Sequence, residues 1–160
     1  MSKFIGARMT DALPMTRGAY NLYRKWIIPA DENPTDEGYL VTDLNGYVNW
    51  SPKERFDRQN FCIYSDHNTI SEEDIEEMID TTHVSTIAIP GHPAKVTIVV
   101  CTLVNGFTIT ESSACVDPRK YSKELGTEIC IKKIKEKIWL LLGFLLQSGL
   151  NGFKGDNYHV

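Results

Sequence analysis

The feature that most constrains the fold is one continuous stretch, residues 96–146. It opens with a strand-like run of β-branched residues, passes through Asn105-Gly106 and leaves as a second strand-like run. Asn-Gly between two such runs is the strongest short signal for a β-hairpin, because both residues tolerate positive φ. After the second run the apolar spacing changes to a helical period that lasts to residue 146. The stretch therefore predicts a hairpin with a long helix packed across it.

The first strand of this hairpin, residues 95–104, is apolar on both faces. Side chains alternate between the two faces of a strand. Here one face would carry valine and isoleucine, and the other threonine, valine and cysteine. Strands with two apolar faces are typically buried on both sides. We therefore predict either the central strand of a sheet or a strand at a surface between subunits.

The helix is predicted to start at residue 119, to break near Gly126 and to resume at Thr127. Its last part, residues 138–146, is apolar around nearly the whole circumference, so it is either covered within the fold or forms a seam between subunits. This run is too short to span a bilayer, so no membrane partner is expected. The predicted core stripe repeats every three or four positions: Ile129, Cys130, Ile134, Ile138, Leu141, Leu142 and Leu145.

An acidic helix and one more strand precede the hairpin. Ser71 and Asp74 form a capping pattern for a helix predicted to end near residue 81. Residues 72–80 hold six acidic side chains and no basic one, whereas residues 119–137 are locally basic. The basic helix could attract a phosphate-bearing ligand or the acidic helix of a neighbouring subunit, and the alternative is that both are solvated faces. A strand is predicted at residues 84–89, followed by a turn at residues 90–93.

Residues 1–58 are predicted to form a separate small module. Thr16 would cap a helix over residues 16–26, and two short strands, 39–42 and 47–50, would meet across a turn ending in Gly46. Ser51 is predicted to cap a further helix with Pro52 as its first residue. So small a module buries little surface by itself, so we expect it to dock on the rest of the chain or on another subunit.

The predicted fold class is α+β. It consists of an antiparallel sheet with a long C-terminal helix packed across it, plus the small N-terminal β-hairpin module. The predicted domains are the module at residues 1–58 and an α+β domain at residues 59–160.

Composition and missing motifs narrow the functional classes. The net charge of −4 argues against a large duplex nucleic-acid footprint. The four cysteines form no CxxC pair and the four histidines are scattered, so no metal site is predicted. No P-loop, dinucleotide fingerprint or hydrolase motif is present, so we expect a protein without cofactor that is not an enzyme. The enzymatic alternative is a thiol mechanism through Cys115 with Glu111 or Asp117. No signal-peptide pattern precedes the module, so an intracellular location is expected.

The candidate ligand site is a polar corner at residues 111–121, between a strand end and a helix start, where backbone N–H groups can meet an anion. The structural alternative is that Asp117-Pro118 simply caps the next helix. The rings of Trp26 and Trp50 could stack on a nucleotide base, or they could be core of the small module. The predicted ligand-binding residues are Glu111, Ser112, Ser113, Asp117, Arg119, Lys120, Tyr121, Trp26 and Trp50.

Two parts of the chain resemble known phage families. Residues 1–58, with PADENPTDEGYLV and WSPKE, resemble a small module of tailed-bacteriophage proteins. That module often precedes other domains, including the Thoeris anti-defence domain of the Tad type, which binds an immune nucleotide signal; no such second domain is evident here. Residues 68–148, with the NGF hairpin, ACVDP and KIWLLLGFLL, are similar to a family of small tailed-phage accessory proteins. That family has no established biochemical role, so no functional residue carries over.

The two resemblances imply a phage accessory protein acting in the host cytoplasm. Because the first module often precedes anti-defence domains, the resemblance implies a counter-defence role for a non-enzymatic homo-oligomer. Such a protein would bind and sequester a nucleotide immune signal of the cyclic oligonucleotide or cyclic ADP-ribose type. The alternative is a phage inhibitor that binds a host defence or replication protein directly, for which the acidic helix and residues 138–146 are the motivation.

Overall fold

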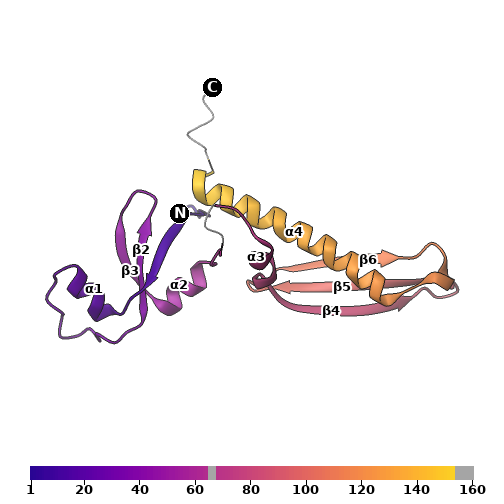
Figure 1. Cartoon of the computed structure of the whole chain (residues 1–160), viewed down its shortest axis with the longest axis horizontal. Coiled ribbons are helices and arrows are strands. Elements are labelled where there is room, and N and C mark those ends of the chain that lie inside the picture. Colours follow the sequence, from indigo (N-terminus) through magenta and orange to yellow (C-terminus); the bar gives the residue numbers. More distant parts are fainter. Residues whose placement is uncertain (65–67, 154–160) are drawn as a thin grey trace, which may run out of the picture. The chain divides into compact units, whose positions relative to one another are not determined.

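The computed structural model describes residues 1–64 and 68–153 and contains two compact units. One unit combines residues 1–62 with the end of the chain from residue 145, and the other is residues 63–144. Figure 1 shows the elements in chain order, coloured from indigo to yellow. The predicted α+β class is confirmed, because the chain forms two three-stranded antiparallel sheets and a long C-terminal helix.

The sheet of the first unit contains one strand more than predicted. Strands β1 (Thr10–Pro14), β2 (Gly38–Asp43) and β3 (Val48–Pro52) pair in the order β1-β2-β3. The predicted hairpin between β2 and β3 is confirmed, and Gly46 adopts the positive φ of 78° that its turn requires. β1 has little β-branched character, so it follows from pairing with β2 rather than from its own sequence.

Two short helices flank this sheet. α1 (Arg17–Tyr23) begins as predicted, with the Thr16 hydroxyl accepting a hydrogen bond from the Ala19 amide at 3.3 Å. The prediction for α2 (Lys53–Gln59) was wrong at its start, because no side chain caps it and Pro52 precedes the helix. Pro52 instead pairs with Gly38, so the strand continues until the helix begins.

The first unit also takes in the end of the last helix. Within it, the Met9 amide donates a hydrogen bond to the Gly149 carbonyl at 3.1 Å. A Cβ on Gly149 would lie 3.3 Å from Met9, so the two segments are in close contact.

In the second unit, the hairpin strand that is apolar on both faces is the central one. Strands β4 (Ile79–Ala88), β5 (Lys95–Leu103) and β6 (Thr108–Ala114) pair in the order β4-β5-β6. This confirms the central-strand alternative, and the predicted turn has Gly106 at φ 83°. One face of β5 is fully buried, with Thr97 and Val99 at its centre, while the residues between them are half-buried.

Helix α3 (Glu72–Glu77) has the predicted capping box between Ser71 and Asp74. It is shorter than predicted, since a helix to residue 81 was expected. Ile79 pairs with Leu103, and Thr81 pairs with Thr102 across a bulge. These residues therefore belong to strand β4 and do not extend the helix. Pairing along the full length of β5 explains why the strand extends beyond the predicted residues 84–89.

Helix α4 (Lys123–Asn151) runs along one face of this sheet (Figure 1). The predicted break near Gly126 was wrong, because Gly126 is needed for a close approach and the helix passes through it. The predicted stripe was wrong for Ile129, Leu141 and Leu145, which are exposed. The buried positions recur at every fourth residue, so they move around the helix as it follows the twisted sheet. Within the second unit they are Gly126, Cys130, Ile134, Ile138 and Leu142.

Two glycines of α4 give a matched test of this packing. A Cβ on Gly126 would lie 2.5 Å from the Thr97 hydroxyl oxygen, whereas a Cβ on Gly143 meets nothing within 4 Å. We expect Gly126→Ala to lower the free energy of unfolding by ~1–3 kcal/mol through overpacking. Gly143→Ala should raise it by ~0.5–1 kcal/mol through helix propensity. Urea titrations followed by circular dichroism measure both, and equal stability of Gly126→Ala and wild type would contradict the packing described.

Candidate functional site

The predicted polar corner is smaller than the sequence indicated. β6 continues to Ala114, so Glu111, Ser112 and Ser113 are strand residues rather than corner residues. The expectation of a corner starting at residue 111 was therefore wrong, because pairing with β5 extends the strand. Ser112 is exposed, whereas Ser113 and Glu111 are partly covered on the alternate face.

Glu111 is bound by the long helix. Its carboxylate forms an ion pair with Lys137, and it lies 4.0 Å from the Lys133 ammonium. The same lysine, Lys133, also donates to the Ser112 carbonyl at 3.5 Å. These contacts attach α4 to the edge strand β6, and they use two of the lysines that made the helix locally basic.

Asp117 and Arg119 bind each other. The Asp117 carboxylate caps the short 3-10 helix η1 (Pro118–Lys120), accepting from the Arg119 amide at 3.1 Å. It also accepts both arms of the Arg119 guanidinium, at 3.0 and 3.1 Å. The Arg119 side chain thereby lowers the pKa of Asp117, and the amide contributes as well. Asp117 therefore caps the helix, which is the structural alternative to a ligand site, and the Arg119 guanidinium is paired with a carboxylate of its own chain.

Tyr121 joins the corner to the sheet. Its hydroxyl lies 3.0 Å from the Thr86 hydroxyl and 2.8 Å from the Thr97 hydroxyl. Hydrogen bonding to Thr86 and then Thr97 lowers the pKa of Tyr121. Lys95 lies over the ring, 5.8 Å from its centroid. The tyrosine therefore holds the entry to α4 against β4 and β5.

The two predicted tryptophans are packed within the first unit. The Trp50 indole donates to the Met15 carbonyl at 2.8 Å, and its ring lies so close to Gly38 that a Cβ there would be 2.4 Å away. Trp26 packs edge-to-face on Tyr20, with ring centroids 5.9 Å apart. The corner residues belong to the second unit. The contacts described for the tryptophans and for the corner residues are therefore all made within their own units.

The described residues contain neither a metal cluster nor a helix that could span a membrane. Among residues 1–64 and 68–153, no three histidine, cysteine, aspartate or glutamate side chains are placed to share a metal ion. His67 and His159 lie outside the described residues. No helix in the described part of the chain is long and apolar enough to cross a membrane.

A groove between α3 and α4, inside the second unit, was not predicted from the sequence. Its volume is about 570 Å³. Ile75 of α3 and Ile131 of α4 form the apolar lining, with Trp139 beside them. Polar side chains also line it: Glu72, Glu128, Lys132, Lys135 and Glu136. The acidic run and the helical stripe were both visible in the sequence, but their meeting depends on how α3 packs.

Lys135 links the two helices across this groove. Its ammonium donates to the Glu72 carboxylate at 2.8 Å and also binds Glu76. These two carboxylates raise the pKa of Lys135. One alternative for the basic helix was attraction to the acidic helix of a neighbouring subunit; here Lys135 binds the acidic helix of its own chain.

The sequence of this unit matches one family model. Residues 70–150 match the model of the phage protein (N4 Gp49/phage Sf6 gene 66) family. The chain belongs to this family. The match spans α3, the second sheet and α4, the part that resembles tailed-phage accessory proteins. No curated protein and no solved structure matches the chain. The association of the first module with Thoeris anti-defence stays a prediction.

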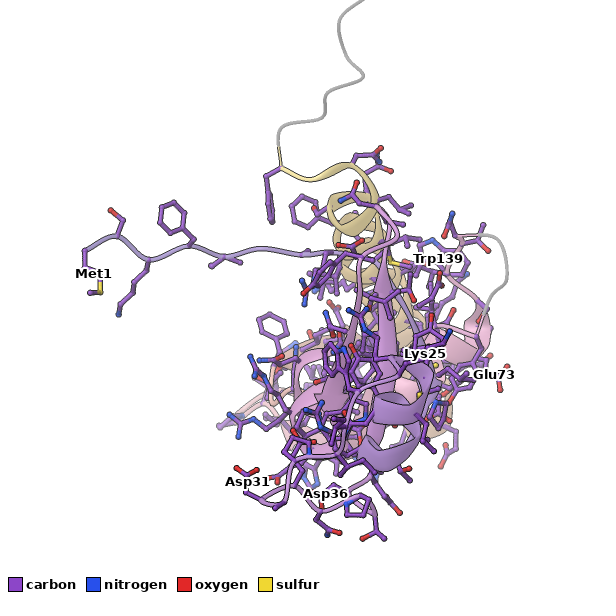
Figure 2. All side chains as sticks on the ribbon, turned by 90° about the vertical axis from the view of Figure 1, so that its left-hand side faces the viewer. Met1, Lys25, Asp31, Asp36, Glu73 and Trp139 are labelled. Atoms are coloured by element: carbon purple, nitrogen blue, oxygen red, sulfur yellow. The ribbon has the colours of Figure 1, made fainter. Side chains whose placement is uncertain are left out.

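This phage protein exposes large apolar side chains on the second half of α4. Leu140 is 71%, Trp139 50% and Leu141 43% exposed, and Phe144 is exposed beside them on the next turn. Trp139 is labelled in Figure 2. Of the two alternatives for residues 138–146, coverage within the fold therefore holds only for Ile138 and Leu142. A seam between subunits stays a prediction.

The wall of the groove formed by α3 depends on a buried carboxylate. Asp74 is fully buried and accepts from the Ser71 amide at 2.7 Å, the Ser71 hydroxyl at 2.8 Å and the Tyr64 amide at 2.8 Å. Burial by itself would raise the pKa of Asp74, but the bonds from Ser71 and Tyr64 outweigh it and the pKa is lowered.

This shift predicts an acid-sensitive phage protein. A depressed carboxyl pKa contributes stability above the unfolded pKa of about 4, which is lost as the pH falls through the lower folded pKa. We expect Asp74→Asn to cost ~1–3 kcal/mol at neutral pH, because the amide cannot accept all three bonds. Below the folded pKa the difference should shrink. Thermal melts from neutral pH into the acid range measure it, and a gap that stays constant with pH would argue against an ionised Asp74.

Proposed function

We propose that this phage protein is a non-enzymatic accessory factor that acts by docking on a host protein. The observation that carries the proposal is the set of exposed apolar side chains on the second half of α4. Leu140 and Leu141 lie four and three residues before Phe144, so these three are neighbours on the helix surface. Clustered exposed apolar side chains of this kind mark sites of protein interaction. Tryptophan is also among the residues that most often dominate the binding energy of an interface.

The free energy available from covering these apolar side chains supports docking as the role of this surface. Covering one leucine or phenylalanine side chain is worth about 1.5–3 kcal/mol relative to leaving it in water. Three or four such side chains on two turns of a rigid helix therefore offer several kcal/mol to a partner that fits them. A helix presents them with little loss of conformational freedom on binding, which favours affinity.

The nucleotide-sequestering role stays a prediction. Arg119 pairs with Asp117, while Lys133 and Lys137 share the one carboxylate of Glu111, so two of these three positive charges are balanced within the chain. None of the residues that line the α3–α4 groove belongs to the corner. For these reasons we favour the alternative of direct inhibition of a host defence or replication protein.

The apolar surface of α4 is tested by placing a photo-crosslinking residue at Leu141 and expressing the full chain in a bacterial host. We expect one dominant host adduct, reduced about tenfold or more by Leu140→Asp, because a charge would have to be buried. The matched control is Val116→Asp, which adds the same charge at a fully exposed residue of the same unit. If both variants retain the adduct equally, or if no adduct forms, α4 is not the docking surface.

The two functions also differ in a ligand test. A ligand that binds the folded state raises the melting temperature by mass action. With cyclic dinucleotides, cyclic trinucleotides and cyclic ADP-ribose isomers at millimolar concentration, we expect no rise. A rise that Arg119→Ala and Lys120→Ala abolish would instead support sequestration of a nucleotide by the corner.

A further inference from the structure

The α3–α4 groove has the dimensions of a side-chain receptor. Its volume of about 570 Å³ lies within the usual range of ligand pockets, roughly 300–1,000 Å³. Among its lining residues, Ile75 is 1% exposed and so is fixed in the core, whereas Trp139 is half-exposed. A fixed apolar residue and an accessible indole in one groove suit one large apolar side chain of a partner.

The charge around the groove is acidic. Three glutamates line it, Glu72, Glu128 and Glu136, against Lys132 and Lys135. Lys135 pairs with Glu72 and with Glu76, which leaves Glu128 and Glu136 against Lys132. α3 adds Glu73 and Glu77 and has no basic residue (Figure 2 labels Glu73). A field of this sign attracts cations and repels phosphates.

Taking apolar lining and acidic rim together, we propose that the groove receives a short basic segment of the partner protein. In this segment one large apolar side chain is flanked by lysine or arginine. The apolar side chain enters between Ile75 and Trp139, and the flanking cations reach the glutamates. Lysine and arginine suit this position because their aliphatic stems cover apolar surface while their charged ends stay in water. The inference rests on the proposed function, whose partner class it specifies.

A second copy of this chain fits the groove less well. Of the basic residues of α4, Lys133 and Lys137 already bind Glu111, and Lys135 binds Glu72 and Glu76 of the same chain. A partner whose lysines or arginines are not paired loses no such contact on binding, so a foreign basic segment is favoured over self-association.

The test uses the full chain and three synthetic peptides. The first has one phenylalanine flanked on both sides by lysines, the second replaces phenylalanine by serine, and the third replaces the lysines by glutamates. We expect calorimetry to show binding of the first alone, weakening as salt is added because the attraction is screened. Equal binding of the lysine and glutamate peptides, or binding of none of them, would overturn the proposal.

Variants locate the binding in the groove. Glu128→Lys with Glu136→Lys leaves the Lys135 ion pairs intact and should weaken binding of the lysine peptide about tenfold or more. Trp139→Ala should do the same through loss of apolar surface. The matched control, Asp31→Lys with Glu54→Lys, makes the same change in net charge at exposed residues of the first unit and should bind normally. Equal weakening by the control pair would overturn the proposal.

Two further outcomes separate this inference from the function on which it rests. If the host adduct depends on Leu140 while no peptide binds, the docking function stands and the basic segment is wrong. If sedimentation shows an oligomer of the chain that Trp139→Ala dissolves, the groove belongs to a second copy and the proposal also falls. If the lysine peptide binds in the groove while no host adduct forms, the groove inference stands and docking through α4 fails.

Discussion

The second unit depends on how closely α4 can approach β5. Gly126 permits this contact, because any larger residue would meet the hydroxyl of Thr97. The Tyr121 hydroxyl fixes the same threonine from the side and holds the start of the helix on the sheet. From that point the buried positions follow at every fourth residue to Leu142. Contact at one end thus sets which face of the helix is buried, and consequently which apolar residues are left at the surface.

Charge pairing decides what the surface of this phage protein can bind. The sequence separates an acidic segment from a basic one, and the fold brings them together within one chain. Lys135 binds α3, whereas Lys133 and Lys137 bind β6 through Glu111. Most of the basic surplus of α4 is thereby used in holding the unit together. The acidic surplus of α3 remains beside the groove, and this surplus is the basis of the proposal that the partner is a cationic protein segment.

Much of the fold could be predicted from local rules. The two Asn-Gly turns, the Thr16 cap and the Ser71–Asp74 capping box each depend on a few neighbouring residues, and all are present. The errors arise where a partner strand decides the outcome: pairing with β5 lengthens β4 and β6, and pairing with β2 creates β1. The candidate site shows the same limit. Glu111 and Arg119 were chosen by their chemistry, but their partners, and the groove beside Trp139, depend on packing that the sequence pattern does not encode.

The hydrogen bond between Met9 and Gly149 has a consequence for how the protein is made. The first unit contains residues from both ends of the chain, so its earliest strands leave the ribosome long before the helix end that completes it. Residues 63–144 must be synthesised in between, which takes on the order of 4–16 s at ~5–20 residues per second. The unit whose synthesis begins first is therefore the last to have all of its residues.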